Sequence, residues 1–333
     1  MKKIAYLFAI VLLTFSCEKS TINDPAIDKE VSASIVPIVN NVTSKEGRLI
    51  FETRDDFNKT VNMLFEHQKK IENFESQFSG YTSNSQAFDN FSSNLKDDTS
   101  INADAIRDFA FIKESNGEKS IEHTIDLRLL SYLFNDKGIL QIGDSIYKYT
   151  YEFTYKFDVN KLSQLKSAKL VESMDGVTAY PNVRNRYKIP ESNLKSAMES
   201  VSEVSQHWQP DGSTECFMKS ELNQNTTVLQ CAITVDTKSR KWNWMGIGVT
   251  YKVYGLYAAA TGYYGWSGIS SGGLSNQYFD VFDQRTGGTT DVQETIAYGS
   301  ITCYPVFVSA TGIHWLKPYS YSQPIYANPS TSY

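Results

Sequence analysis

Alternation of apolar and polar residues dominates residues 213–333 and constrains the fold more than any other feature of the chain. Glycine, threonine and lysine separate one run of apolar side chains: Met245, Ile247, Val249, Tyr251 and Val253. The same period of two runs through residues 227–235. Because successive side chains of a β-strand point to opposite faces, this period predicts half-buried strands. We therefore expect residues 213–333 to form an all-β domain, either a sandwich or a barrel-like fold.

Residues 48–165 instead predict an α+β module. Thr53 and Asp56 have the spacing of a capping box at a helix start. Apolar residues then recur at steps of three and four, which puts a stripe on one helix face: Phe57, Val61, Leu64, Phe65, Ile71, Phe74 and Phe78. Residues 139–150 alternate around Gly143 and Asp144, which is typical of a β-hairpin.

Residues 166–212 are expected to connect the two parts. Pro190 and Pro210 bound a set of apolar residues at helical spacing: Leu194, Ala197, Met198, Val201, Val204 and Trp208. This spacing predicts an amphipathic connector helix of about seventeen residues.

The N-terminus has the pattern of a bacterial export signal. Lys2 and Lys3 precede an apolar run over residues 4–15, shorter than the roughly 20 residues that a membrane-spanning helix needs. A small residue, Ser16, stands directly before Cys17, as at the cleavage site of bacterial lipoproteins. We expect removal of residues 1–16, lipidation of Cys17 and a polar tether over residues 17–47. Such a protein is attached by its lipid to the outer membrane, at its periplasmic face or at the cell surface.

The N-terminal half also resembles a known group of proteins. The capping box, the aromatic helix and residues 135–149, with the sequence NDKGILQIGDSIYKY, resemble a module of uncharacterised lipoproteins from Bacteroidetes-type Gram-negative bacteria. The resemblance covers roughly residues 1–165. It implies a lineage and an envelope location for a domain of unknown function. It implies no activity and no catalytic residue.

The charge of the chain argues against nucleic acid as a partner. The formal net charge is −5, and it becomes −7 when Lys2 and Lys3 are removed with the leader. The longest basic blocks are pairs such as Lys69 with Lys70. Binding to a phosphate backbone requires clustered basic residues that release counterions, and the sequence has no such cluster.

Three cysteines besides Cys17 form an odd set in a compartment where disulfides persist. Cys216 and Cys231 stand fifteen residues apart in two strand-like runs, and a hairpin could bring them opposite each other. We expect these two to form a disulfide. Cys303 alternates with apolar neighbours, which is typical of a buried, inert thiol.

Catalytic and metal-binding motifs are weak. Residues 268–272 match the nucleophile elbow of α/β-hydrolases, with Ser270 at the centre and His314 later in the chain. No helical period follows this match, although the elbow joins a strand to a helix. The four histidines are far apart in the sequence, and no Cys-x-x-Cys pair occurs. We expect no cofactor and no metal, with Ser270 and His314 as weak catalytic candidates.

Aromatic residues in the β-rich part are the strongest binding signal in the sequence. The candidate ligand-binding residues are Trp242, Trp244, Tyr263, Tyr264 and Trp266. Flat rings with polar tips suit stacking on sugars or contact with a protein partner. The alternative is that these rings are ordinary strand residues that cover a sheet.

Together these patterns favour a lipid-anchored envelope protein that binds a glycan or a surface protein without catalysing a reaction. Two alternatives stay open. One is an envelope hydrolase with a site assembled from loops. The other is a structural or assembly protein that adds a strand to the sheet edge of a neighbour.

Overall fold

The computed structural model of this chain describes residues 41–95, 101–115, 117–165, 171–184, 203–210, 215–267, 276–299 and 304–332. Cys17, Ser270 and Cys303 lie outside these ranges, as do the predicted leader and most of the predicted tether. The described residues belong to one compact unit, Ile35–Tyr333. None of the helices within the described ranges is long and apolar enough to cross a membrane.

Helix α1 (Arg54–Glu66) begins at the capping box that the sequence predicts. The Asp56 amide donates to Thr53 Oγ1 at 3.1 Å, and the Thr53 amide donates to Asp56 Oδ2 at 3.1 Å. The apolar stripe does not stay α-helical to its end. After His67 it continues through the 3-10 turns η1 (Gln68–Asn73) and η2 (Glu75–Gln77), and its residues remain in the core of the N-terminal part.

The first sheet packs against α1 and has the strand order β1-β2-β5-β6-β7-β8. Its strands are β1 (Val42–Lys45), β2 (Arg48–Phe51), β5 (Ile139–Ile142), β6 (Ser145–Tyr149), β7 (Phe153–Asp158) and β8 (Thr178–Pro181). The antiparallel pair β5 and β6 is the hairpin that the sequence predicts around Gly143. The α+β character of the N-terminal module is confirmed.

The second sheet combines strands from both parts of the chain. Its order is β10-β11-β12-β13-β4-β3, with β16 also on β12 and β9 also on β11. The strands are β3 (Ala110–Ser115), β4 (Glu118–His123), β9 (Val183–Arg184), β10 (Glu203–Trp208), β11 (Cys216–Thr226), β12 (Cys231–Trp242), β13 (Ile247–Thr250) and β16 (Asp291–Gly299). The junction is the parallel pairing of β13 with β4. Strands of the N-terminal module thus extend the C-terminal sheet.

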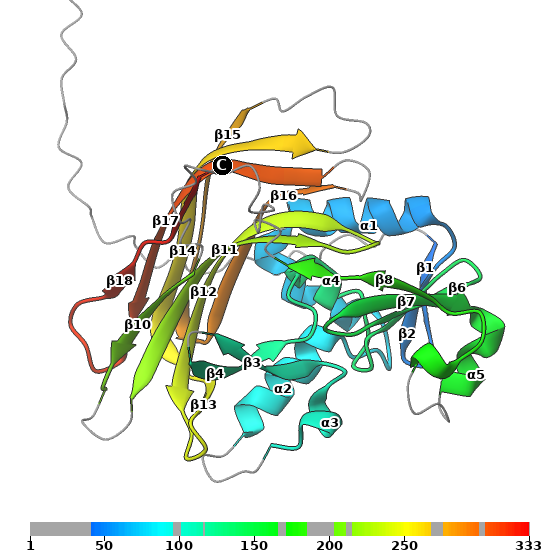
Figure 1. Cartoon of the computed structure of the whole chain (residues 1–333), viewed down its shortest axis with the longest axis horizontal. Coiled ribbons are helices and arrows are strands. Elements are labelled where there is room, and N and C mark those ends of the chain that lie inside the picture. The colour runs from blue at the N-terminus through cyan, green and yellow to red at the C-terminus, as the bar shows by residue number, and fades with distance from the viewer. Residues whose placement is uncertain are drawn as a thin grey trace, which may run out of the picture. The chain divides into compact units, whose positions relative to one another are not determined.

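The third sheet covers the apolar face of β11 and β12 (Figure 1). It has the order β15-β14-β17-β18, with β19 also on β17. Its strands are β14 (Val253–Ser267), β15 (Gln277–Thr289), β17 (Tyr304–Lys317), β18 (Ile325–Ala327) and β19 (Ser330–Ser332). Met218, Ile233 and Val235 of the second sheet pack in one core with Leu256 and Leu316 of the third. This face-to-face packing confirms the predicted all-β architecture of the C-terminal part.

Short helices lie on the opposite side of the second sheet. They are α2 (Asn84–Asn94), α3 (Ala103–Ile106) and α4 (Arg128–Ser131). Three further short helices, η3 (Val159–Lys161), α5 (Leu162–Leu165) and η4 (Val171–Ser173), border the first sheet. Ser83 caps α2 by accepting a hydrogen bond from the Gln86 amide at 3.0 Å, which fixes where this helix begins.

The described end of the predicted connector helix is a strand instead. Glu203–Trp208 forms β10 and pairs with β11 along its whole length. Val204 and Trp208 are four residues apart, so they share a face in a helix and equally in a strand, and the spacing alone did not discriminate. Pairing with β11 decides the outcome, and Trp208 is buried beside the ring of Tyr251. Residues 185–202 lie outside the described ranges.

The predicted disulfide between Cys216 and Cys231 does not fit the strand register. Strands β11 and β12 do form an antiparallel hairpin, but Cys231 lies opposite Thr226 and Cys216 lies opposite Lys241. The two cysteines therefore lie at opposite ends of the hairpin, about 33 Å apart at the rise of a strand. The turn sets this register, because the Thr227 hydroxyl accepts hydrogen bonds from the amides of Leu229 and Gln230.

Candidate functional site

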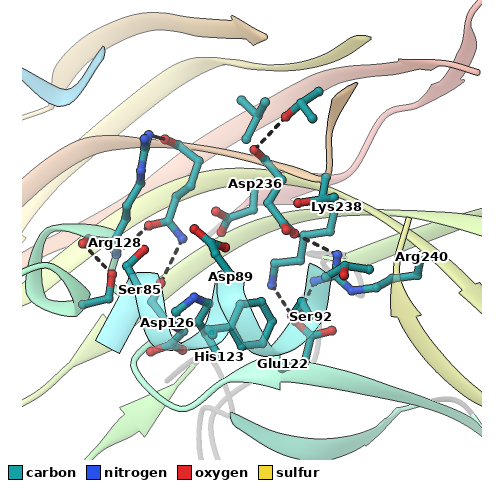
Figure 2. Close-up of a pocket in the computed structure, with 18 of the residues that line it drawn as sticks. Ser85, Asp89, Ser92, Glu122, His123, Asp126, Arg128, Asp236, Lys238 and Arg240 are labelled. Atoms are coloured by element: carbon teal, nitrogen blue, oxygen red, sulfur yellow. Dashed lines mark hydrogen bonds and ion pairs between the residues drawn. The ribbon is translucent and has the colours of Figure 1, made fainter. Parts of the chain in front are cut away.

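A cavity of about 870 Å³ lies between helix α2 and the polar face of the second sheet (Figure 2). Strand β11 directs Lys219, Glu221 and Asn223 to this face, while Met218 and Leu222 point into the sandwich core. Strand β12 alternates in the same way and presents charged residues to the cavity: Asp236, Lys238 and Arg240. One face of the second sheet thus packs in the core, and its other face forms a charged wall of the cavity.

Helix α2 supplies the facing wall. Ser85, Phe88, Asp89 and Ser92 line the cavity, and their spacing of three and four residues places them on one face of the helix. The Asn84 side chain donates to the backbone oxygen of Asp108 at 2.8 Å and ties the helix start to the segment before β3. The helix therefore holds this polar face toward the sheet.

A buried ion network occupies one end of the cavity; we define it as Lys113, Glu122, Glu221, Lys238, Arg240 and Asp291. Lys238 Nζ lies 3.2 Å from Glu122 Oε2 and 2.7 Å from Glu221 Oε2. Arg240 lies 3.5 Å from Glu122 and 2.8 Å from Asp291. Figure 2 shows Glu122, Lys238 and Arg240 beside one another. Strands β3, β4, β11, β12 and β16 each contribute charges, so the network links five strands of the sheet.

Mutual attraction keeps these side chains charged despite their burial. Burial alone would lower the pKa of Lys238, but the carboxylates of Glu122 and Glu221 outweigh it and hold that pKa well above its ordinary value. Burial would likewise raise the pKa of Glu122, yet Lys238 and Arg240 hold it well below the usual range for glutamate. The charges on this part of the wall are therefore compensated by one another.

Asp236 differs from its neighbours in the same wall. Its side chain is 1% exposed, and burial raises its pKa to about 7. One carboxyl oxygen, Oδ2, accepts hydrogen bonds from Asn223 at 2.5 Å and from Thr234 at 3.1 Å. The other, Oδ1, is buried and has no hydrogen-bond partner among the described residues. A buried carboxyl oxygen without a partner is consistent with a carboxyl that holds its proton.

Asp89 is a second carboxyl with a raised pKa. It is accessible from the cavity, and within the described part of the chain it has neither an ion pair nor a side-chain hydrogen bond. The residue is exposed. Desolvation of its carboxyl by the surrounding protein, together with the negative charge of Asp291, raises the pKa of Asp89 to about 7, although the nearby Arg128 opposes the shift.

Aromatic rings complete the wall. Phe111 of β3 and Tyr151, which precedes β7, both line the cavity, and their ring centres lie 3.8 Å apart. The ring of Phe88 lies 3.9 Å from the imidazole of His123. Burial lowers the pKa of His123 to about 4, so this imidazole is neutral at physiological pH. The cavity therefore offers ring faces beside charged and amide groups.

The aromatic residues selected from the sequence do not form one site. Trp244 is 67% exposed in the turn after β12, and Trp242 packs on Phe217 with ring centres 4.6 Å apart. Tyr263 is 46% exposed, and Tyr264 contacts Trp266 edge to face. All five are described, and none lines the cavity. They stay candidates for a separate surface contact.

His314 lies in the sandwich core and not in the cavity. Its side chain is fully buried on β17, and Nδ1 lies 2.7 Å from the Thr237 hydroxyl. Burial lowers the pKa of His314 to about 4. Its proposed partner Ser270 lies outside the described residues. The cavity thus contains neither of the two weak catalytic candidates among its described lining residues.

The sequence did contain a signal for the cavity, because polar residues alternate along both central strands. Lys219, Glu221 and Asn223 are separated by steps of two, as are Asp236, Lys238 and Arg240. Such a pattern indicates a strand with one charged face. The pattern does not say that this face is covered. The covering helix α2, like the strands β3 and β4 that extend the sheet, comes from the distant N-terminal module. Among the described residues, no group of three His, Cys, Asp or Glu side chains is arranged to hold a metal ion.

Comparisons with known proteins add little to this geometry. No protein-family model matches the chain, and no curated protein matches it. Among solved structures, a DUF4848 family protein from Bacteroides thetaiotaomicron VPI-5482 is 13% identical. That match covers 87% of this chain and 99% of the other, with a TM-score of 0.26. The neighbour comes from the bacterial group that the N-terminal half resembles, but a TM-score this low establishes no shared fold and no function.

Proposed function

We propose that this protein is a lipid-anchored envelope protein that binds a glycan in the cavity. The observation that carries the proposal is a cavity of about 870 Å³ whose wall combines ring faces with charged and amide side chains. Sugars present apolar C–H faces that stack on rings and hydroxyls that both donate and accept hydrogen bonds. A concave site with a few convergent polar groups is the usual form of a small-ligand site.

The charge balance of the wall favours a hydroxyl-rich ligand over a strongly ionic one. The cations Lys113, Lys238 and Arg240 are each ion-paired with carboxylates of the same wall. An ionic ligand would have to compete with these pairs. A neutral sugar can instead donate its hydroxyls to an acceptor that remains accessible in the cavity, such as Asp89.

Binding to the cavity is tested with glycan arrays and titration calorimetry on the full chain in detergent. We expect Tyr151→Ala to weaken binding of an array-positive glycan about fivefold, because it removes one ring face worth about 1 kcal/mol. Tyr319→Ala is the matched control, since Tyr319 is exposed and does not line the cavity. Its affinity should equal that of the wild type.

Trp244→Ala distinguishes the cavity from the exposed aromatic residues. We expect no change, because Trp244 lies outside the cavity. If Trp244→Ala lost binding while Tyr151→Ala kept it, the glycan site would lie at the exposed aromatic residues and not in the cavity. A chain that binds no glycan on the array would contradict the proposal altogether.

The anchor rests on the sequence around Cys17, namely the basic start, the short apolar run and Ser16. We expect cells fed a clickable palmitate analogue to label the wild-type chain and not the Cys17→Ser variant. The measurement is in-gel fluorescence after immunoprecipitation, with Cys303→Ser as the control that keeps its label. Equal labelling of the wild type and Cys17→Ser would exclude this residue as the lipid site.

A further inference from the structure

We propose that the cavity recognises a carboxylate on the glycan, as in a uronic acid, through the paired side chains of Arg128 and Arg285. This inference rests on the proposed function, because it names the class of glycan that the same cavity binds. Both arginines line the cavity, and both contact one carboxylate of the chain, that of Glu72. Two guanidinium groups that converge on one carboxylate form a receptor for that group.

The two arginines come from separate elements, and other groups hold each of them in place. Arg128 belongs to α4; its backbone amide donates to Gln293 Oε1 at 2.8 Å, and its Nη1 donates to the Gln293 backbone oxygen at 3.3 Å. Arg285 belongs to β15, and its Nε lies 3.3 Å from Oδ2 of the buried Asp283. Each guanidinium group thus has an anchor other than Glu72.

Glu72 is the most exposed of the three residues. It lies on the 3-10 turn η1, and its side chain is 45% exposed, against 13% for Arg128 and 27% for Arg285. Arg285 Nη1 lies 2.7 Å from Glu72 Oε1, and Arg128 Nη2 contacts the same oxygen. Within the described part of the chain, the other oxygen, Oε2, has no hydrogen-bond partner. Exposed ion pairs contribute little stability, so Glu72 leaves the two arginines with little loss of free energy.

A carboxylate on the ligand makes better use of the same donors. It presents one oxygen to each guanidinium group, whereas Glu72 offers a single oxygen to both of them. Hydrogen bonds between guanidinium groups and a carboxylate are among the strongest in proteins when both carboxylate oxygens are engaged. In a uronic acid this carboxylate stands on the same ring as the hydroxyls and C–H faces that the cavity binds. Glu72 thus occupies the place of the ligand carboxylate in the free protein.

This arginine pair is separate from the buried ion network. Figure 2 shows Arg128 and Arg240 on opposite sides of the cavity. Within the network the carboxylates are buried, as in the pair of Lys238 with Glu221 at 2.7 Å, so a ligand does not displace them readily. A single carboxylate on a hydroxyl-rich ligand therefore competes with Glu72 and leaves the network intact.

The test is an array that carries neutral glycans and uronic-acid oligosaccharides, each acid beside its methyl ester. Titration calorimetry of the strongest acid and its ester follows, with the full chain in detergent. Esterification removes the charge and keeps the ring and its hydroxyls. We expect the acid to bind at least about tenfold more tightly than its ester. Arg128→Gln and Arg285→Gln should each lower this ratio at least about threefold. The ratio compares two ligands on one variant, so it does not depend on the fraction of that variant that folds.

Glu72→Gln should act in the opposite direction. Removal of the internal carboxylate should strengthen binding of the acid about threefold and leave binding of the ester unchanged. Glu66→Gln is the matched control, because Glu66 is an exposed acid that does not line the cavity, and its affinities should equal those of the wild type. Equal binding of acid and ester, array binding by neutral glycans only, or an unchanged ratio in both arginine variants would overturn the carboxylate site and leave the proposed function intact. Absence of any glycan binding would overturn both.

Discussion

Replacement of Glu122 by glutamine is expected to destabilise the fold by about 3–5 kcal/mol, the usual cost of removing one partner from a buried ion pair. Glu122 is 5% exposed and lies 3.2 Å from Lys238 and 3.5 Å from Arg240. Glutamine preserves the shape of the side chain but removes its charge. These two cations and Lys219, whose Nζ lies 3.6 Å from Glu122 Oε1, then remain buried with less compensation. The ion pairs that join β4 to β11 and β12 are weakened as a result.

Urea unfolding at neutral pH measures this effect. Glu114→Gln is the matched control, because Glu114 lies on the neighbouring strand β3 with an exposed side chain. We expect its unfolding midpoint to equal that of the wild type. Because the pKa of Glu122 is depressed in the folded state, its contribution is present above the ordinary glutamate pKa and is lost as pH falls. A loss below about 1 kcal/mol for Glu122→Gln would contradict a network that supports the fold.

Asp236 is expected to make the fold less stable as pH rises. Its folded pKa is raised to about 7, so between the ordinary aspartate pKa and about 7 the unfolded chain ionises while the folded chain keeps its proton. Stability is therefore full at low pH and is lost as pH rises through about 7. The charged groups that act on this carboxyl are Lys238, which opposes the shift, and Glu221, which adds to it; the side chains of Asn223 and Gln293 also oppose the shift.

Comparison with Asp236→Asn isolates this effect from all other titrations. Relative to this variant, which does not titrate, the wild type should lose about 2–3 kcal/mol between about pH 5 and about pH 8. The measurement is the free energy of unfolding of both chains in urea at several pH values. Parallel curves for the two chains would show that Asp236 is ionised throughout and that its burial does not hold the proton.

Features set by neighbouring residues were predictable from the sequence. The capping box of Thr53 and Asp56 and the hairpin of β5 and β6 depend on contacts within a few residues. The period of two predicted the C-terminal sheets, because one face of each strand packs in the sandwich core. The turn at Thr227 also fixes the register of β11 and β12, and this register places Cys216 opposite Lys241, so the predicted pairing of Cys216 with Cys231 is wrong.

Features set by distant pairing were not predictable. The parallel pair β13 and β4 joins residues on either side of the connector, and no local pattern indicates it. The cavity depends on the same strand pairing, because β4 brings Glu122 next to Lys238 and Arg240. The alternating charges indicated a polar strand face. They gave no sign that the N-terminal module covers this face. The aromatic residues that the sequence made most conspicuous, such as Trp244, lie elsewhere.

Hydrogen–deuterium exchange with and without an array-positive glycan tests the central claim most directly, because it locates the ligand without altering the chain. A glycan in the cavity should slow exchange in α2 (Asn84–Asn94) and in β3 (Ala110–Ser115), which border the cavity. Exchange in β14 and β15, whose exposed side chains include Tyr263 and Tyr278, should stay unchanged. Protection of β14 and β15 with no change in α2 and β3 would contradict the assignment of the cavity as the glycan site.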